Sequence, residues 1–410
     1  MVLGPCMPEW SQIVSEYWLA LLKSTPRDQL ATKILRPTRG VKLSEDAAMF
    51  LAYAEALRGA GYVAPNPMVG AVLLDKNGGY LSSGAHLRVG GAHAEVEAIN
   101  QIASENLLDG GTLVVTLEPC SHHGRTPPCA DMIARTGIKT ILFGLKDPNP
   151  VVNGAGEQKL RSAGKIARQL DRWSGPCEWL TRVFITNQTE KRIYVGMKVA
   201  STPLGVIAGD KSSRLWITNE RSRQMGHFLR LEYDAICVGS GTAILDDPRL
   251  DVRCPEIDGR MPLRIVVDGQ GLLLQRMPPL QLLTTAPERT LVILPNGSPD
   301  TLERAFGVNV LRLPLNERGQ FNWKEVGEHL WKQGITSLLL EGGAGLYESA
   351  DQQSFIDALH WFVAPDGPVD GLKWPVNSVA FQFYKKGGGV PLEGDRLVEV
   401  GLGMGGTNFV

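Results

Sequence analysis

Hydrophobic positions between residues 43 and 188 follow the helical and the strand period in turn. Apolar residues at helical spacing follow Ser44, a good helix-capping residue, and predict a helix that ends near Gly59. Two short apolar runs around an Asn-Gly turn predict a β-hairpin over residues 69–83. The remaining patterns predict strands at Thr112–Leu117 and Lys139–Phe143 and helices at Ala92–Ile102, Cys129–Ala134 and Glu157–Gly164. Together they predict an α/β sandwich built on a mixed sheet.

A second α/β pattern begins after a change of composition near residues 174–188. Its predicted strands are Tyr194–Ala200, Asp234–Val238, Leu263–Val267, Thr290–Leu294, Asn309–Leu313, Ser337–Leu340 and Leu359–Val363. Its predicted helices are Asn219–Leu231, Trp323–Gln333 and Gly345–Ala350. The tail beyond Ala364 is rich in Gly and Pro and has no clear pattern. A chain of 410 residues divides well into two domains. We place them at 43–188 and 189–410, after an N-terminal extension of residues 1–42.

Composition narrows the class of function. A formal net charge of −1 gives no basic surface for nucleic acid or an anionic membrane, and no apolar run approaches the roughly 18 residues of a membrane span. Six cysteines in 410 residues make no disulfide framework, and a reducing, cytoplasmic setting fits them. The alternative is a plastid or mitochondrial presequence within residues 1–42, against which Glu9 and Glu16 argue.

The candidate chemistry lies in the first pattern. His93 and Glu95 stand two residues apart, and Cys120 and Cys129 follow, each directly after a proline. One imidazole and two thiolates can hold Zn²⁺ and leave its fourth position open for water, as in nucleobase deaminases. Glu95, off the metal, would take a proton from that water, pass it to the ring nitrogen and later protonate the leaving ammonia. Cys129 falls at a predicted helix start, where the helix dipole favours a thiolate.

Each part of this pattern is weak alone, since His-x-Glu pairs and buried cysteines are common. A closed structural zinc site would need a fourth ligand, which His122 or His123 could supply. Glu118 could either interact with the zinc ligands or be a solvated side chain. The order of His-x-Glu, strand, Pro-Cys and a second Pro-Cys at a helix start is far more specific, and it favours catalytic zinc.

A family resemblance appears at these residues. The segment Thr116–Cys129 resembles the signature of the bifunctional deaminase/reductase family of riboflavin biosynthesis, RibD, and so do Pro65–Gly70, Gly84–His86 and Lys146–Pro150. The long insert between the cysteines differs from cytidine and tRNA-adenosine deaminases. The resemblance implies a cytidine-deaminase-like α/β/α sandwich that deaminates 2,5-diamino-6-(5-phosphoribosylamino)pyrimidin-4-one to 5-amino-6-(5-phosphoribosylamino)uracil.

The same resemblance implies the substrate contacts of this domain. Asn66 and His86 would contact the base, and the loop from His122 to Arg125 would close over the ligand. The plainer alternatives are that Asn66 only makes a turn between two prolines and that His86 is a surface residue.

The second pattern is similar to the reductase domain of that family, which has a dihydrofolate-reductase-like fold. The matching stretches include Trp216–Thr218, Gly239–Thr242, Leu245–Arg253, Arg264–Asp268 and Leu340–Leu346. The resemblance implies substrate contacts from Arg230, Leu250, Arg253 and Glu341, and NADPH contacts from Trp216, Thr242, Asp246, Gly343, Ala344, Gly345 and Leu346. Independently of the family, a Gly-rich turn after a buried strand suits phosphate, and two arginines suit a ribose phosphate. Each of these residues alone also fits a turn, a cap or a solvated ion pair.

Three stretches depart from the family pattern of the reductase. Where the family has Ser-Leu-Asp-Gly followed by Lys or Arg, this chain has Thr202–Val206, so that Leu204 replaces the acid and Val206 the base. The family's Gly-x-Ser-x-Trp is replaced by the longer Ser212–Trp216, which displaces the Ser, and Pro365–Pro368 replaces an apolar family stretch. The second domain is therefore either an NADPH-dependent reductase or a degenerate scaffold.

Three functions follow. The leading one is a riboflavin-pathway deaminase of a pyrimidine ribonucleotide, without nucleic-acid or membrane partners. The others are a zinc deaminase of another pyrimidine or purine and a non-catalytic zinc-stabilised interaction protein. The resemblance also implies a homodimer formed through the reductase domain.

Overall fold

The computed structural model describes residues 36–122, 127–149, 153–208, 216–253, 261–275, 279–374, 378–386 and 388–402. Residues 1–35, which make up most of the predicted extension and any presequence, and Arg125 lie outside this set. The described chain forms two compact units, one ending at Lys191 and the other beginning at Arg192. No helix among the described residues is long and apolar enough to cross a membrane.

The first unit is a helix–sheet–helix sandwich. Its elements are α3 (Glu45–Leu57), β1 (Gly70–Leu74), β2 (Tyr80–Ala85), α4 (Ala94–Ile99), β3 (Thr112–Leu117), α5 (Cys129–Ala134), β4 (Thr140–Leu145), α6 (Ala155–Ser162), β5 (Ile166–Gln169) and α7 (Ser174–Thr189). The strand order is β2-β1-β3-β4-β5. β1 runs antiparallel to β2 and β3, and β3, β4 and β5 are parallel. The predicted hairpin and mixed sheet are confirmed.

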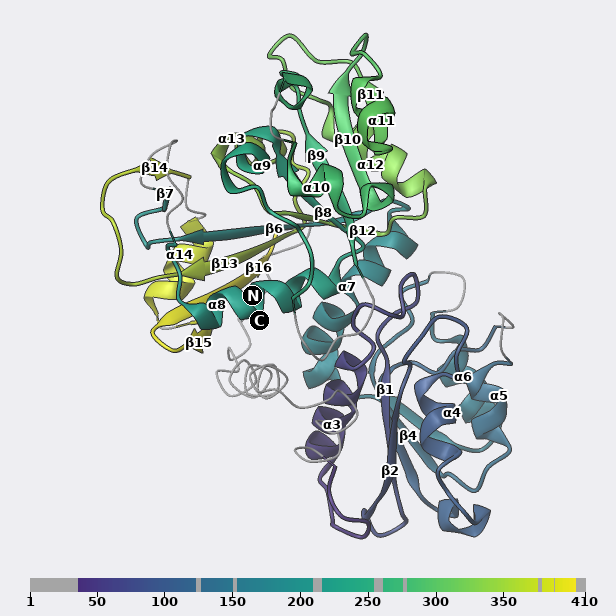
Figure 1. Ribbon diagram of the computed structural model, residues 1–410. Coiled ribbons are helices and arrows are strands. Elements are labelled where there is room, and N and C mark those ends of the chain that lie inside the picture. The colour runs from purple at the N-terminus through teal and green to yellow at the C-terminus, as the bar shows by residue number, and fades with distance from the viewer. Residues whose placement is uncertain are drawn as a thin grey trace. The chain divides into compact units, whose positions relative to one another are not determined.

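Helices cover both faces of this sheet. α4, α5 and α6 lie on one side and α3 on the other (Figure 1). The Ser44 side chain accepts the Ala47 N–H and caps α3 as predicted. Residues 36–42, the last of the predicted extension, are attached to this unit. Arg36 pairs with the buried Glu55 of α3, and Gly40 N–H donates to the Tyr80 carbonyl.

The second unit is larger and has a mostly parallel sheet. Its strands are β6 (Tyr194–Ser201), β7 (Val206–Ala208), β8 (Ala235–Gly239), β9 (Leu263–Val267), β10 (Thr290–Pro295), β11 (Asn309–Leu313), β12 (Ser337–Leu340), β13 (Ala358–Val363), β14 (Leu372–Lys373), β15 (Val390–Leu392) and β16 (Asp395–Gly401). Its helices are α8 (Glu220–Leu229), α9 (Ser240–Asp246), α10 (Gln281–Thr284), α11 (Thr301–Phe306), α12 (Trp323–Lys332), α13 (Ala344–Gln352) and α14 (Ser378–Lys385).

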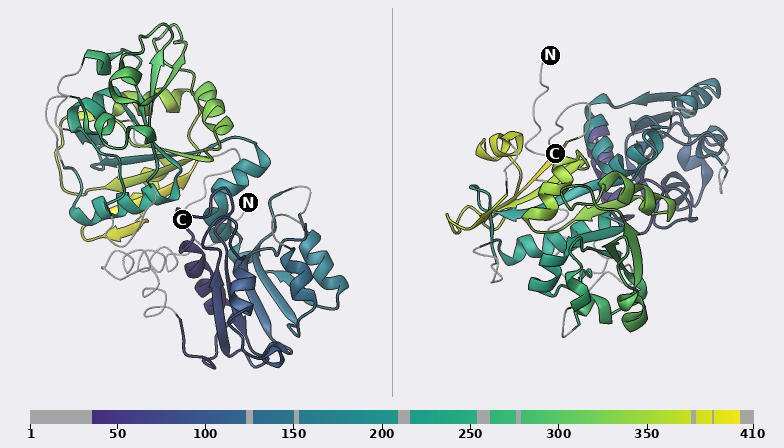
Figure 2. Two further views of the ribbon diagram at one scale, coloured as in Figure 1. Left: turned by 45° about the vertical axis from the view of Figure 1, so that its right-hand side comes forward. Right: turned by 90° about the horizontal axis from the view of Figure 1, so that it is seen from above.

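Nine of these strands form one sheet in the order β11-β10-β9-β8-β12-β6-β13-β16-β15. β16 runs antiparallel to its two neighbours, β13 and the edge strand β15, and all the other neighbouring pairs are parallel. One apolar core lies between the sheet and α12, α13 and α14, and another between the sheet and α9, α10 and α11. Figure 2 shows the sheet between these layers. Continuous apolar runs such as Leu338–Leu340 suit strands that are covered on both faces. β7 and β14 form a separate antiparallel pair.

Two predicted elements need correction. The helix predicted at Ala92–Ile102 begins at Ala94 and ends at Ile99, so His93 is its cap and not part of its first turn. The segment 174–188, where the composition changes, belongs to the 16-residue helix α7. Pro176 is tolerated there because it lies in the first turn of the helix, where its missing N–H has no hydrogen-bond partner to lose.

Candidate active sites

The three predicted zinc ligands converge beyond the carboxyl end of β3. His93 caps α4, Cys120 follows β3 and Cys129 opens α5. His93 Nδ1 lies 3.3 Å from Cys129 Sγ and 3.7 Å from Cys120 Sγ, and the three ligand atoms lie within 4.8 Å of one another. Zinc bonds of about 2.0–2.3 Å in tetrahedral geometry set ligand atoms about 3.5–3.8 Å apart. The donor set and its spacing therefore fit Zn²⁺.

Glu95 lies beside this cluster and is buried, with 3% of its surface exposed. Burial, and then the charge of Cys120, raises the pKa of Glu95 to about 7. Its carboxyl group is within hydrogen-bond reach of Cys129. A carboxyl group whose pKa lies near neutrality can both take and return a proton, which suits the predicted proton carrier.

Asn66 and His86 also lie at this cluster, joined to each other. The Asn66 amide nitrogen is 3.1 Å from His86 Nε2, and His86 Nδ1 is 2.9 Å from the Ala92 carbonyl oxygen. The amide donates to Nε2, so Nδ1 carries the ring proton and donates to Ala92. The His86 ring meets the His93 ring edge-on at 5.4 Å between centroids. Since both ring nitrogens of His86 have protein partners, the ring sets the orientation of Asn66.

Glu118 organises the loop beyond the site. Its buried carboxylate accepts the backbone N–H groups of Asp147 (3.0 Å), Gly154 (3.1 Å) and Glu157 (2.8 Å). A Cβ at Gly156 would lie 2.1 Å from the Pro119 carbonyl oxygen, so the loop packs against the zinc segment. Of the alternatives for Glu118, the solvated side chain is wrong. His122 is exposed.

The second unit contains a cavity of about 980 Å³ at the carboxyl ends of β6, β8 and β12. Most of the predicted reductase residues line it: Trp216, Arg230, Thr242, Asp246, Leu250, Arg253, Glu341 and Gly343. Ala344 and Gly345 lie in the first turn of α13, and Leu346 packs into the core beneath. A Cβ at Gly342 would lie 2.3 Å from the Leu346 side chain, which explains why this turn needs glycine.

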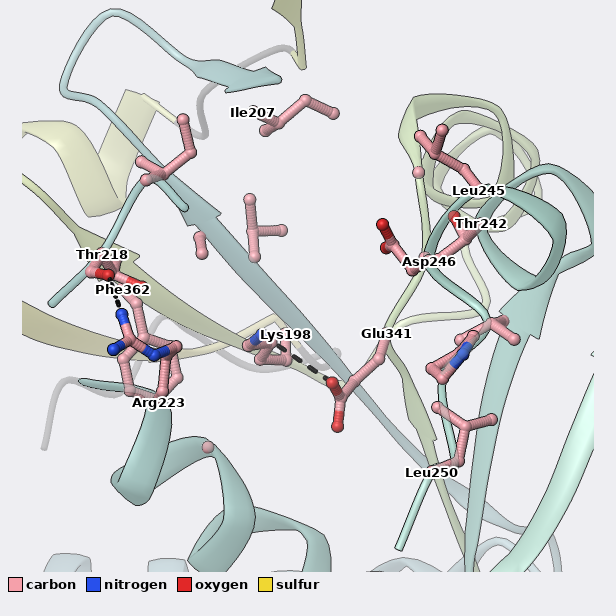
Figure 3. A pocket seen from close by; sticks show the side chains of 18 of the residues that line it. Lys198, Ile207, Thr218, Arg223, Thr242, Leu245, Asp246, Leu250, Glu341 and Phe362 are labelled. Carbon is pink, nitrogen blue, oxygen red and sulfur yellow. Dashed lines mark hydrogen bonds and ion pairs between the residues drawn. The ribbon is translucent and has the colours of Figure 1, made fainter. Parts of the chain in front are cut away.

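An ion cluster lies in the centre of the cavity. Arg230 forms a forked pair with Glu341 at 2.6 and 3.0 Å. On the same carboxylate, Lys198 lies 3.7 Å from Glu341, as Figure 3 shows. Burial would raise the pKa of Glu341, but the charges of Arg230 and Lys198 outweigh it and hold the pKa at about 2. Arg230 is therefore committed to Glu341. Arg253, with 54% of its side chain exposed, is the more open of the two arginines predicted to hold phosphate.

Two further walls of the cavity lie on either side of this cluster. Thr242 and Asp246 project from α9 on one side, and Phe362 lies on the other side, with its ring centre 5.8 Å from Lys198 Nζ (Figure 3). Trp216 is 58% exposed, and the Arg223 guanidinium lies 4.8 Å from its ring centre. A flat exposed ring and a glycine turn suit the base and phosphates of a dinucleotide.

The departing stretch Thr202–Val206 does not line this cavity. Val206 is completely buried and Leu204 is 58% exposed in a turn. The position where the family has its acid, Leu204, therefore faces the solvent, and the position of the family's base, Val206, faces the core.

Three residues of these sites were not singled out by sequence reasoning: Lys198, His227 and Asp147. A lysine within a buried strand was a usable signal for Lys198, because strand alternation places it on the face of Gly196 and Ala200. Nothing local marks His227, whose partners come from a distant loop.

The folds and sites define a zinc-binding nucleobase deaminase domain followed by a nucleotide-dependent reductase domain. Family models agree: residues 44–145 match the zinc-binding region of cytidine and deoxycytidylate deaminases, and residues 193–366 match the RibD C-terminal domain. The chain is 38% identical to the riboflavin biosynthesis protein RibD of Actinobacillus pleuropneumoniae, covering 77% of this chain and 82% of that protein. It is 33% identical to RibD of Escherichia coli, covering 76% and 84%.

Solved structures give the same result. Acinetobacter baumannii RibD matches with a TM-score of 0.70 and 29% identity, over 89% of this chain and 99% of that one. The diaminohydroxyphosphoribosylaminopyrimidine deaminase/5-amino-6-(5-phosphoribosylamino)uracil reductase of Thermotoga maritima matches with a TM-score of 0.68 and 30% identity, over 87% and 97%. The chain belongs to the RibD family of riboflavin biosynthesis and is an enzyme with a zinc deaminase domain and a reductase domain of the NADPH-using type. The expected fold classes of both domains are confirmed.

Proposed function

We propose that this chain carries out two successive steps of riboflavin biosynthesis. The first is hydrolytic deamination of 2,5-diamino-6-(5-phosphoribosylamino)pyrimidin-4-one, and the second is NADPH-dependent reduction of the ribosyl group of its product. The single observation that carries the proposal is the cluster of His93, Cys120 and Cys129 with the buried Glu95 beside it.

The residues of the first site divide the work. His93, Cys120 and Cys129 would hold zinc, which supplies an acidified water when bound. Glu95 would take one proton from that water and give it to the ring nitrogen. After the hydroxide has added to the ring carbon, Glu95 would take the proton of the new hydroxyl group and give it to the amine, which leaves as ammonia as the carbon–nitrogen bond breaks. Asn66, fixed by His86, faces the pyrimidine with the remaining hydrogen-bonding groups of its amide.

The second site supports reduction in this chain and not only a vestigial scaffold. Lys198, Arg230 and Glu341 form an intact ion cluster, and Leu204 and Val206, which replace the family's acid and base, do not line the cavity. NADPH, when bound, supplies the hydride. Lys198 is placed beside the buried carboxylate of Glu341, where it can donate a hydrogen bond to a sugar oxygen. Arg253 lies at the edge of the cavity, where it can receive the phosphate.

The proposal is tested by supplying the diaminopyrimidine ribonucleotide to the zinc-loaded protein and measuring ammonia. We expect one ammonia per substrate and, after addition of NADPH, one equivalent of NADPH oxidised. Absence of ammonia would overturn the deaminase assignment. Ammonia without NADPH oxidation would show that the second domain is a scaffold. A panel of other pyrimidines and purines would reveal a different preferred substrate.

We also propose that the protein works in a reducing compartment such as the cytoplasm. Cys120 and Cys129 must be thiolates to bind zinc, and the described cysteines, Cys120, Cys129, Cys177 and Cys237, are all free.

A further inference from the structure

His227 occupies an unassigned position in the second cavity. It lies on α8 one turn before Arg230, is half-buried and lines the cavity together with Arg253. Its Nδ1 is 3.2 Å from the Asp251 carbonyl oxygen, and its Nε2 is 3.4 Å from Arg253 Nη2. The imidazole thus bridges the helix and the loop that carries Arg253.

The partners decide which ring nitrogen carries the proton. The Arg253 guanidinium has only donors, so Nε2 of His227 must accept from it. Nδ1 then carries the proton and donates to the Asp251 carbonyl. This tautomer gives up the bond in which the Arg253 backbone N–H would donate to Nδ1 at 3.3 Å. The opposite tautomer would keep that bond, but it would point an N–H at the guanidinium and give up the bond to the Asp251 carbonyl. Burial, followed by the charges of Arg230 and Arg253, lowers the pKa of His227 to about 4, although Glu341 and the Asp251 carbonyl act in the other direction. The ring is therefore neutral at physiological pH.

The loop held by this ring needs support. Leu250 is buried in the left-handed region at φ 52°, a conformation that leucine rarely adopts. The Asp251 carbonyl oxygen accepts from Arg230 at 2.8 Å as well as from His227, so both of its lone pairs are used. The Asp251 carboxylate pairs with Arg253 at 3.0 Å. The Arg253 guanidinium thus lies between a carboxylate and an imidazole acceptor.

We propose that His227 is a positioning residue, which holds the Arg253 guanidinium and its loop so that they face the phosphate of a ribonucleotide in the cavity. A neutral imidazole suits this task because it accepts a hydrogen bond without adding a second negative charge beside the guanidinium, which already pairs with the Asp251 carboxylate. The inference rests on the proposed function only in taking a sugar phosphate as the ligand.

The test measures the affinity for ribose 5-phosphate by calorimetry and, in parallel, the kcat and KM of the reductase for the pyrimidine ribonucleotide and for NADPH. The variants are His227→Ala, His227→Asn, Arg253→Ala and the double variant H227A/R253A. Asn places an N–H donor where Nδ1 was, so it keeps the bond to the Asp251 carbonyl and loses only the acceptor for Arg253. The matched control is His329→Ala, since His329 lies on α12 and its side-chain hydrogen bond within the described part of the chain is to the Glu325 carbonyl of the same helix.

His227→Ala removes two hydrogen bonds and should weaken ribose 5-phosphate binding, and raise the KM for the ribonucleotide, by about tenfold. kcat, the KM for NADPH and deamination should be unchanged. His227→Asn should raise the KM for the ribonucleotide by less than His227→Ala does, but still measurably. A merely structural role, met by the retained bond to the Asp251 carbonyl, would leave this KM unchanged in His227→Asn. Because His227 acts through Arg253, the double variant should bind no more weakly than Arg253→Ala alone.

Three results would overturn the inference: independent effects of the two substitutions that multiply, an effect of His227→Ala no larger than that of His329→Ala, or no binding of ribose 5-phosphate by the unmodified protein. Binding without NADPH oxidation would refute the proposed reductase function alone, and the affinities would still decide the role of His227.

Discussion

Glu341 is the buried anchor of the second cavity, and replacing it by glutamine should destabilise the second unit strongly. Its side chain is 8% exposed and pairs with Arg230, which is 14% exposed. Removing one partner of such a pair leaves the other charge buried and uncompensated. The pKa of Glu341 falls from 4.5 to about 2 on folding. Each tenfold change in a protonation equilibrium is worth about 1.4 kcal/mol, so the carboxylate contributes about 3 kcal/mol at pH 7.

The pH dependence of this contribution has a fixed sign. The folded pKa is depressed, so the stabilisation is fully present above about pH 4.5 and is lost as the pH falls through about 2. The difference in free energy of unfolding between the unmodified protein and Glu341→Gln should therefore fall to about half at pH 3.

The assay is urea-dependent hydrogen exchange on peptides from β6, β8 and β12, which reports the second unit alone. Glu348→Gln is the matched control, because Glu348 is exposed on the neighbouring helix α13 and should change stability by less than about 0.5 kcal/mol. A loss below about 1 kcal/mol for Glu341→Gln at pH 7, or a loss that does not shrink in acid, would refute the electrostatic reasoning.

Three further predictions concern other residues. His86→Ala should retain zinc and lower kcat/KM for deamination about tenfold, because Asn66 loses its fixed orientation. Unchanged kinetics would show that His86 does not position Asn66 for catalysis. Glu118→Gln should lower the free energy of unfolding of the first unit by about 2 kcal/mol in urea denaturation, because an amide oxygen replaces a carboxylate that accepts three N–H groups; an unchanged midpoint would contradict this. Val206→Lys should destabilise the second unit by several kcal/mol, whereas Leu204→Asp should leave both stability and NADPH oxidation unchanged; faster oxidation by the latter would show that the missing acid matters.

The strands and the zinc site were the most predictable parts of this chain. The predicted bounds of β3, β9, β11 and β12 agree with the structure. In β3 and β12 the reason is that a strand buried on both faces leaves a nearly continuous apolar run, whereas β11 is mostly half-buried and contains Asn309 and Arg312. The zinc ligands were predictable because metal chemistry restricts residue type and order together.

Long-range partners explain what could not be predicted. Arg230 was expected to donate hydrogen bonds to phosphate, but its guanidinium forms a two-fold hydrogen-bonded pair with Glu341, which is far along the chain. β16 forms by pairing with β13 on one side and β15 on the other, so its own sequence of mixed residues carries little signal. The roles of Glu118 and His227 likewise depend on backbone groups of distant loops.

The central claim, a zinc deaminase in which Glu95 carries the proton, is tested most directly by one paired measurement on Glu95→Gln: bound zinc and ammonia release from the diaminopyrimidine ribonucleotide. Glu97→Gln, on the same helix, is the control. We predict that Glu95→Gln binds one zinc per chain and loses activity by at least about a hundredfold, while Glu97→Gln keeps both. Full deamination by zinc-loaded Glu95→Gln would contradict the account.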